Sequence, residues 1–506
     1  MSTNEQNDDA TQQDAATRHR LIEERLRKLE EIRATRNPYP HSYTRTHTSV
    51  ELHEQEADLV AAKATVRIAG RVMTKRKAGK TMFLPLYDGP GKIQIYAKKD
   101  ILGDEDFEFF KKMIDTGDII GVEGTLFRTR TDELTVEVHG YELLTKSLRP
   151  LPEKFHEMSL ELKCRKRYLD LIMNLETRER FRKRSQVLDM IRRFLVDEDF
   201  LEVETPVLQP LYGGATARPF KTHHNALDQT LYLRIADELY LKRLIVGGFE
   251  KVFEFCKDFR NEGMDRTHNP EFTMMECYAA YWDYNGMMDL VERMMMKLVD
   301  RFGDEGRITY GEYELDFSNG FRRLRFLDGI KEETGVDFAS LDDDQVVAEA
   351  KKLGVTILKG MGRDKILDEV FGTFVEPKLI QPTFVLDHPV ELSPLAKWHR
   401  EDEGLVERFE GFIAGFEICN SFSELNDPQV QRERFMAQMD LKAKGDEEAQ
   451  VLDEDFLEAL ETGMPPTGGL GMGLDRLVML FTDCNSIRDV LLFPAMRPEE
   501  SQGGLD

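Results

Sequence analysis

The sequence predicts an α+β protein of two domains, in which a small N-terminal β-barrel precedes a larger domain of strands and helices. Its 506 residues exceed the usual length of one domain. Five short strand-like runs lie between residues 65 and 146, with the helical segment EDFEFFKKMID after the third. Further on, two apolar runs of strand period flank a polar loop between Val252 and Phe272, which predicts a long hairpin.

Composition excludes several classes of protein. No apolar run approaches the roughly 20 residues that span a bilayer, and the polar N-terminus lacks the core of a signal peptide, so we expect a cytoplasmic protein without membrane contact. A net charge of -25 argues against a generic polyanion binder, although the excess acid lies outside the predicted barrel. The five cysteines are widely spaced and form no C-x-x-C pair, which indicates buried apolar residues and neither disulfides nor a zinc knuckle.

The N-terminal segment has two parts. Residues 1–17 are polar and acidic, which predicts a disordered tail. From Arg18 to Arg36, apolar residues recur at helical spacing among basic ones, and the pattern ends before Asn37-Pro38. This basic helix either contacts a nucleic acid or packs on its own domain.

The five predicted strands and their helix are typical of an OB-fold barrel, which commonly binds single-stranded nucleic acid. The ring of Phe83 could stack on an unpaired base, while Gln94 and Glu133 could hydrogen-bond a base edge. Composition alone allows Phe83 to be a core residue equally well. The helix and barrel together cover residues 18–148, and a proline-containing linker follows over residues 149–158.

The second domain is predicted to cover residues 159–506. A long basic helical pattern leads into the strand LEVETPVL, and a glycine-rich loop around Gly214 follows, where backbone can approach a ligand closely. Glu238 lies at a strand-to-helix transition in LYLRIADELYLKRL. Residues 286–375 alternate helical patterns with polar connections, which predicts a helical insertion.

The hairpin loop carries the chemistry that is easiest to identify. Arg260 is a planar fork suited to a carboxylate or a phosphate, Arg266 and His268 could reach further phosphates, and Phe272 offers a ring face to a nucleobase. Taken alone, the loop is better explained as the solvated tip of a hairpin.

Three segments together resemble the motifs of the class II aminoacyl-tRNA synthetases. FRNEG followed by HNPEF is similar to motif 2 of the lysyl branch, the segment from Arg165 through LEVETPVL to motif 1, and GGLGMGLDRLVMLF to motif 3. The barrel resembles the anticodon-binding domain of the lysyl, aspartyl and asparaginyl enzymes. This resemblance implies a catalytic domain with an antiparallel sheet flanked by helices, and a homodimer formed through motif 1.

The resemblance also implies a set of binding residues. Arg260 would bridge the amino-acid carboxylate and the α-phosphate of ATP, and Arg476 would lie on the ATP phosphates. The implied ATP site contains Arg260, Glu262, His268, Asn269, Phe272, Gly473 and Arg476. The implied L-lysine site contains Gly214, Glu238, Arg260, Glu276, Tyr278, Asn420, Phe422 and Glu424, and the anticodon site Phe83, Gln94 and Glu133.

Glu410 and Glu417 are the implied ligands of Mg²⁺, for which oxygen ligands are suitable. Their spacing of seven is odd, so on one strand they would point to opposite faces unless the backbone bulges or bends.

The reaction implied is the formation of lysyl-adenylate and pyrophosphate from lysine and ATP, followed by transfer of lysine to tRNA(Lys). The carboxylates of Glu238 and Glu424 suit an ammonium group, whereas aspartate or asparagine would need cationic or amide donors. The alternative is a catalytically silent paralogue that binds tRNA or nucleotide. The presence of Arg260, Arg476 and both metal-ligand candidates argues against it.

Overall fold

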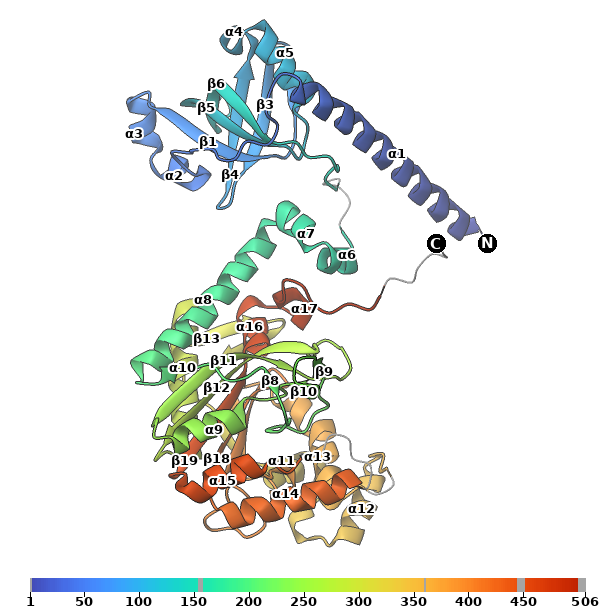
Figure 1. Ribbon diagram of the computed structural model, residues 1–506, viewed down its shortest axis with the longest axis vertical. Coiled ribbons are helices and arrows are strands. Elements are labelled where there is room, and N and C mark those ends of the chain that lie inside the picture. Colours follow the sequence, from blue (N-terminus) through green and yellow to red (C-terminus); the bar gives the residue numbers. More distant parts are fainter. Residues whose placement is uncertain (1, 153–157, 359–360, 444–450, 499–506) are drawn as a thin grey trace. The chain divides into compact units, whose positions relative to one another are not determined.

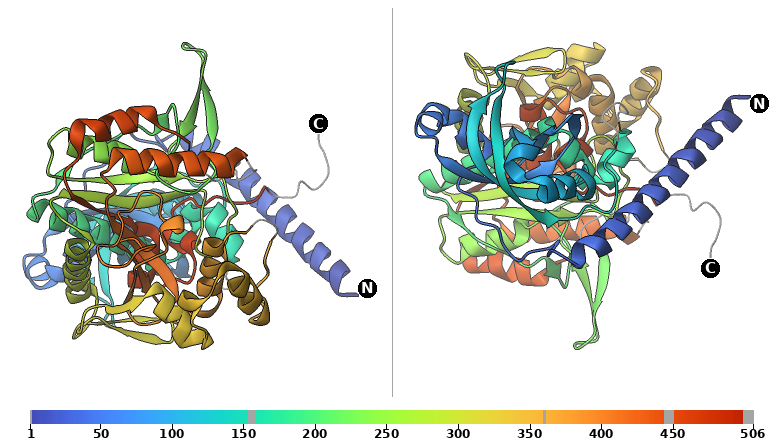
Figure 2. Two further views of the ribbon diagram at one scale, coloured as in Figure 1. Left: turned by 90° about the horizontal axis from the view of Figure 1, so that it is seen from below. Right: turned by 90° about the horizontal axis from the view of Figure 1, so that it is seen from above.

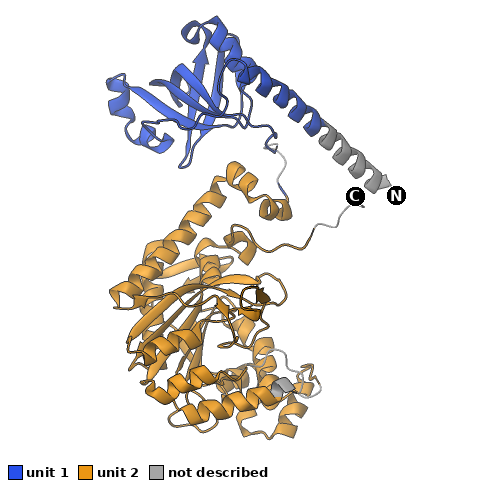
Figure 3. Cartoon of the chain, in the orientation of Figure 1, with its two compact units in different colours: residues 1–158 blue, residues 159–506 orange. Residues whose placement is uncertain are grey.

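The computed structural model describes residues 2–152, 158–358, 361–443 and 451–498 (Figure 1). The chain divides into two compact units, residues 1–158 and residues 159–506 (Figure 3). Part of the predicted linker, residues 153–157, lies outside the described residues. Among the described residues, no helix combines the length and the apolar character that a membrane crossing would require.

Unit 1 is a barrel whose sheet has the order β1-β5-β6-β4-β3-β2 and is closed by pairing of β1 with β3. Alternate side chains along each strand face a common apolar core, as in Met82, Leu84 and Leu86 of β3. The predicted helix after the third long strand is present as α5. The elements are α2 (Ser49–Glu54), α3 (Glu56–Ala61), β1 (Thr65–Val72), β2 (Arg76–Ala78), β3 (Thr81–Tyr87), β4 (Lys92–Lys98), α4 (Lys99–Leu102), α5 (Asp104–Met113), β5 (Ile119–Arg128) and β6 (Leu134–Thr145).

The N-terminal helix α1 is assigned over Ser2–Arg33, and the disordered tail at residues 1–17 stays a prediction. Further along, Arg25 donates hydrogen bonds to the carbonyls of Thr116 (2.9 Å) and Ser147 (3.0 Å). These bonds and the burial of Ile32 show that the second half of the helix packs on its own unit, which is one of the two possibilities that its sequence left open.

Unit 2 is built on an eight-stranded sheet of order β15-β16-β17-β18-β19-β12-β11-β7. The predicted hairpin is confirmed, because β11 and β12 pair antiparallel from Lys251 opposite Ala279 to Phe259 opposite Glu271. The strands are β7 (Leu201–Glu202), β11 (Lys251–Phe259), β12 (Glu271–Ala280), β15 (Arg322–Arg325), β16 (Thr383–Leu386), β17 (Arg408–Ile413), β18 (Phe416–Ser423) and β19 (Thr467–Gly473).

Helices cover this sheet in two groups (Figure 2). α8 (Leu175–Asp197), α10 (Tyr284–Phe302) and α16 (Leu474–Thr482) share one apolar core with the strands. α9 (Glu238–Val246), α14 (Pro428–Ala443) and α15 (Glu454–Gly463) form a second core with Val252, Tyr278 and Ala280. Smaller elements complete this part: α6 (Leu160–Arg165), α7 (Arg167–Met173), α17 (Ile487–Val490) and the sheet of β8 (Leu208–Gln209), β9 (Lys221–His224) and β10 (Gln229–Leu233).

The region predicted as a helical insertion, residues 286–375, differs from that expectation in two ways. Its first helix, α10, belongs to the main core through Met287, Met294 and Met295. Strands β13 (Arg307–Tyr310), β14 (Tyr313–Asp316) and β15 follow it. A separate core then forms around α11 (Phe326–Thr334), α12 (Asp343–Lys352) and α13 (Arg363–Phe374), with the short helices η1 (Phe338–Ser340), η2 (Glu376–Lys378) and η3 (Val390–Leu392) nearby in sequence.

Candidate active site

A cavity of about 420 Å³ in unit 2 collects most of the predicted site residues. Two rows of cross-strand partners run across the sheet at this cavity. One row is Glu410, Asn420, Gly471, Glu276 and Glu254, and the other is Arg408, Phe422, Gly469, Tyr278 and Val252. The cavity lining contains Gly214, Glu238, Arg260, Glu262, His268, Asn269, Phe272, Glu276, Tyr278, Glu417, Asn420, Phe422, Glu424, Gly473 and Arg476.

Glycines of β19 make room at the centre of these rows. A Cβ atom at Gly469 would lie 1.9 Å from Oε1 of Glu424 and 2.6 Å from the ring of Tyr278. Gly471 and Gly473 continue the same face of the strand and also line the cavity. The glycine-rich pattern therefore clears space for acidic and aromatic side chains of neighbouring elements.

Two carboxylates define one end of the cavity. Glu238 and Glu424 are both buried, and the ammonium of Lys242 forms ion pairs with both of them. Lys242 contacts Oε2 of Glu424, whereas no donor from any described residue reaches Oε1. Burial raises the pKa of Glu424 well above its usual value, and the charge of Lys242 opposes that rise. A bound cation would supply the missing hydrogen bond to Glu424 and would favour its ionised form.

Sequence reasoning missed Lys242, which is fully buried. The signal was present, because Lys242 follows Glu238 by four residues on one helix face. Burial lowers its pKa, but the two carboxylates outweigh that effect and raise it. With all three groups ionised, this trio carries one net negative charge.

Glu276 and Tyr278 lie side by side on β12, and the hydroxyl of Tyr278 donates a hydrogen bond to Glu276 at 3.0 Å. Gly214 crosses the start of α9 with a φ of +86°. A Cβ atom there would lie 3.0 Å from Cβ of Ala236 and 3.2 Å from Cβ of Glu238. The positive φ and this close approach both favour glycine at position 214.

The opposite part of the cavity is cationic. The guanidinium of Arg260 lies 5.0 Å from the ring centroid of Phe272, and its Nε is buried without a hydrogen-bond acceptor among the described residues. Arg476 lies 3.0 Å from Nε2 of His268 and donates to the backbone carbonyl of Glu417 at 2.9 Å. Two arginines and a histidine can therefore face an anion from different elements.

Two predicted residues on the hairpin loop differ in their surroundings. Glu262 is exposed at the rim of the cavity. Asn269 also lines the cavity, but its side chain donates to the carbonyl of Glu271 (2.5 Å) and accepts from the amide of Ala495 (3.1 Å). The Asn269 side chain thus anchors the loop to the C-terminal segment.

Two predicted residues of this unit, Arg266 and Glu410, are not among the residues that line the cavity. Glu410 is one of the two metal-ligand candidates. Glu410 lies on β17, whereas Glu417 lies on β18. The expectation that an odd spacing points two side chains to opposite faces holds only within one strand, so it does not apply to this pair. The register of these antiparallel strands shifts between Gly411 and Phe412, which places Glu417 opposite Phe412 and on the face of Glu410. The pKa of Glu417 is raised by burial and by the negative charge of Glu410, with Arg476 opposing.

This pair fits a divalent cation through its chemistry. Burial and then the charges of Glu417 and Glu410 raise the pKa of Glu376 to about 7, and burial and then the charge of Glu410 raise the pKa of Asp368 to about 6. Mg²⁺ prefers carboxylate oxygens as ligands, and Glu376 and Asp368 add further carboxyl groups near enough to interact electrostatically with the pair. Arg408 already compensates part of the charge, because it forms an ion pair with Glu410 (2.5 Å).

Sequence reasoning also missed Arg408, which lines the cavity and donates from Nε to Asn420 at 3.0 Å. The alternation RFEGF placed it on the same strand face as Glu410, which is the signal that could have identified it. Asn420 is consequently oriented by an arginine from the adjacent strand.

In unit 1, Phe83 and Gln94 point outward from the barrel, on the strand positions that alternate with its core. The ring of Phe83 lies 4.7 Å from that of Tyr96, which lies 5.7 Å from that of Phe127. Gln94 donates to Thr135 at 3.0 Å, and Glu133 is exposed. Phe83 is therefore a surface aromatic residue and not part of the core.

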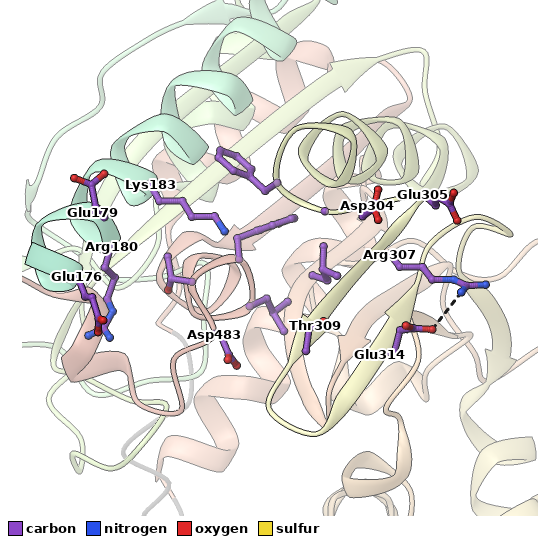
Figure 4. Close-up of a pocket in the computed structure, with 16 residues that line it drawn as sticks. Glu176, Glu179, Arg180, Lys183, Asp304, Glu305, Arg307, Thr309, Glu314 and Asp483 are labelled. Atoms are coloured by element: carbon purple, nitrogen blue, oxygen red, sulfur yellow. Dashed lines mark hydrogen bonds and ion pairs between the residues drawn. The ribbon is translucent and has the colours of Figure 1, made fainter. Parts of the chain in front are cut away.

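A second cavity of unit 2, of about 860 Å³, lies between α8, the end of α10, the β13–β14 hairpin and the end of α16 (Figure 4). Charged side chains of both signs line it, among them Arg180, Lys183, Glu305 and the Arg307–Glu314 pair (3.3 Å). The predicted site residues do not lie among its lining residues.

Comparison with known proteins agrees with this geometry. Residues 159–497 match the family described as tRNA synthetases class II (D, K and N), and residues 66–144 match the OB-fold nucleic acid binding domain. A lysine–tRNA ligase of Carboxydothermus hydrogenoformans is 53% identical over 483 residues, which cover 95% of this chain and 98% of that protein. Lysine–tRNA ligases of Listeria innocua and Methanoculleus marisnigri are 52% and 51% identical, over 91% and 94% of this chain and 94% of each relative. The chain therefore belongs to the class II tRNA synthetases of the D, K and N group.

Proposed function

We propose that this protein is a lysine–tRNA ligase, which activates L-lysine with ATP and transfers it to the 3′ end of tRNA(Lys). Membership of the class II family supplies the reaction type, and relatives with the name lysine–tRNA ligase match nearly the whole chain. The observation that carries the choice of amino acid is the unfilled acceptor capacity of Glu424 beside Glu238 in the cavity.

The charge of this pocket selects the substrate. Glu238, Glu424 and Lys242 leave one net negative charge, which a single side-chain ammonium neutralises. Aspartate would bring a second negative charge, and asparagine would leave the buried carboxylate without a cation. A site built for a charged group rejects an analogue that lacks the charge, because its own polar groups then stay unpaired.

The first step joins a carboxylate oxygen of lysine to the α-phosphorus of ATP and breaks the bond to pyrophosphate. The lysine carboxylate is already an ionised nucleophile, so positioning and charge stabilisation carry the step. Arg260 would hold the carboxylate and the α-phosphate together, Arg476 and His268 would contact the phosphates, and Phe272 would stack on adenine. Glu262 and Asn269 would complete the adenine end, and Gly473 lets the phosphates approach the backbone.

At the amino-acid end, Gly214 and Glu276 would bind the α-amino group, with Tyr278 holding Glu276. Asn420 and Phe422 would line the path between the two ends of lysine. Glu410 and Glu417 would hold Mg²⁺, which when bound offsets phosphate charge.

The barrel would read the anticodon through Phe83, Gln94 and Glu133, since a half-buried, outward-facing ring beside polar groups suits an unpaired base. We further propose a cytoplasmic homodimer. Its interface would include the motif 1 segment, where Leu201, Leu208 and Leu211 are exposed near the edge strand β7. Light scattering of the wild type and of Leu208→Asp tests the dimer, since a buried charge should shift the protein towards monomers.

Pyrophosphate exchange tests the proposed reaction. The protein is incubated with ATP, labelled pyrophosphate and each amino acid in turn, and charging of tRNA(Lys) is measured separately. Exchange that depends on lysine and on no other amino acid is expected. Exchange with aspartate or asparagine would reject the pocket assignment, and no exchange in a folded protein would support a silent tRNA- or nucleotide-binding paralogue.

A further inference from the structure

Asp237, the residue before α9, is a buried carboxyl group behind the cavity. It is 0% exposed and is not among the residues that line the cavity, whereas its neighbours Ala236 and Glu238 are. Although Asp237 occupies the N-cap position, its side chain accepts no hydrogen bond from the helix. Throughout the described residues, no donor reaches either of its oxygens.

The groups around Asp237 are mostly acidic or neutral. Its carboxyl group is in hydrogen-bonding contact with that of Glu276, and its nearest oxygen lies within 4.8 Å of the Cys256 sulfur and an Asp258 oxygen. The charged and titratable groups that face this site are Glu238 from α9, Glu254, Cys256 and Asp258 from β11, Glu276 and Tyr278 from β12, and Arg234.

The guanidinium of Arg234 is near this site, but it hydrogen-bonds to groups other than Asp237. Arg234 donates from Nη1 to Glu254 at 2.7 Å and from Nε to the carbonyl of Lys257 at 2.9 Å, and it lies 3.4 Å from Asp258. No hydrogen bond from Arg234 reaches Asp237 among the described residues. Two carboxyl groups in contact, without a cation between them, can form a hydrogen bond only if one of them carries a proton.

We propose that Asp237 is a neutral carboxylic acid that donates a hydrogen bond to the Glu276 carboxylate and thereby positions Glu276 for the α-ammonium group of the substrate. This inference rests on the proposed lysine site. Glu276 would receive one donor from Asp237 and a second from Tyr278, which leaves lone pairs for the ammonium. Burial and the charge of Glu276 raise the pKa of Asp237 well above its usual range, consistent with a retained proton. A carboxylic acid kept neutral by its surroundings is an effective donor.

The test compares two substitutions of similar size. Asp237→Asn keeps a neutral donor, so its KM for lysine in pyrophosphate exchange should stay within about threefold of the wild type. Asp237→Leu removes the donor, and its KM for lysine should rise roughly ten- to 100-fold, with the KM for ATP unchanged. If Asp237 were ionised, both variants would remove the same charge, and equal losses in the two would overturn the proposal.

Infrared spectroscopy provides a readout independent of activity. At pH 8, protein labelled with ¹³C-aspartate should show a protonated carboxyl band that is absent from Asp237→Asn. No difference between these spectra would overturn the proposal even if lysine activation fails. Asp170→Asn, a buried carboxyl paired with Arg167 outside the cavity, is the matched control and should keep both the band and the KM for lysine. Stoichiometric transition metal in the full-length protein, lost in Cys256→Ser, would also overturn it, because Asp237 would then be a ligand.

Discussion

The charge balance of the ammonium pocket makes a quantitative prediction for Glu238→Gln. In the wild type, Glu238 and Glu424 outnumber Lys242 by one negative charge; after the substitution, Lys242 neutralises Glu424 and no net charge remains for the substrate. A unit charge about 4 Å from an ammonium, at an effective dielectric constant of about 20, is worth about 4 kcal/mol. Partial solvation reduces this, so we expect kcat/KM for lysine to fall roughly 100- to 1,000-fold.

The double variant Glu238→Gln/Lys242→Met tests the cause. It restores one net negative charge on Glu424, so kcat/KM for lysine in pyrophosphate exchange should recover at least about tenfold from the single variant. The KM for ATP should be unchanged in both. Glu407→Gln is the control, because Glu407 is equally buried but pairs with Arg400 outside the cavity. A folded double variant no more active than Glu238→Gln would refute the charge argument.

Three further predictions concern other parts of the site. Arg260→Lys should lose at least about 100-fold in single-turnover adenylate formation, because an ammonium cannot form two parallel hydrogen bonds, and a near-normal rate would move Arg260 away from the reacting atoms. Burial and then the charge of Asp258 raise the pKa of Glu276 to about 8, so the ionised fraction of this carboxyl group grows as the pH rises towards 8. Since the α-ammonium needs the ionised form, lysine affinity by calorimetry should rise up to about tenfold per pH unit as the pH approaches 8 from below; a flat profile would contradict this. Phe83→Ala should weaken tRNA(Lys) binding roughly five- to 150-fold while lysine-dependent exchange stays unchanged, whereas unaltered tRNA affinity would reject the stacking role.

The sequence by itself determined those features that depend on local pattern. Strand alternation defined the β11–β12 hairpin with Arg260 at its end and the barrel strands, but it left open whether Phe83 faces outward or into the core. The motif resemblances then selected fifteen cavity-lining residues from segments more than 200 residues apart. The hairpin and the barrel strands could be predicted because each rests on neighbours within one strand or one short segment.

Only the tertiary structure decided how distant segments face one another. The register shift between β17 and β18 brings Glu417 to the face of Glu410, against the single-strand expectation. The need for glycine at position 469 of β19 comes from the side chains of Glu424 and Tyr278, which lie on neighbouring segments. The lack of a hydrogen-bond donor for Asp237 likewise depends on how β12 packs against the start of α9. Likewise, Lys242 has the sequence pattern of an ordinary surface pair with Glu238. Burial against Glu424, which is distant in the sequence, places the charge of Lys242 inside the proposed ammonium pocket. Its effect there depends on the distance and solvation of groups in space, which the sequence does not show.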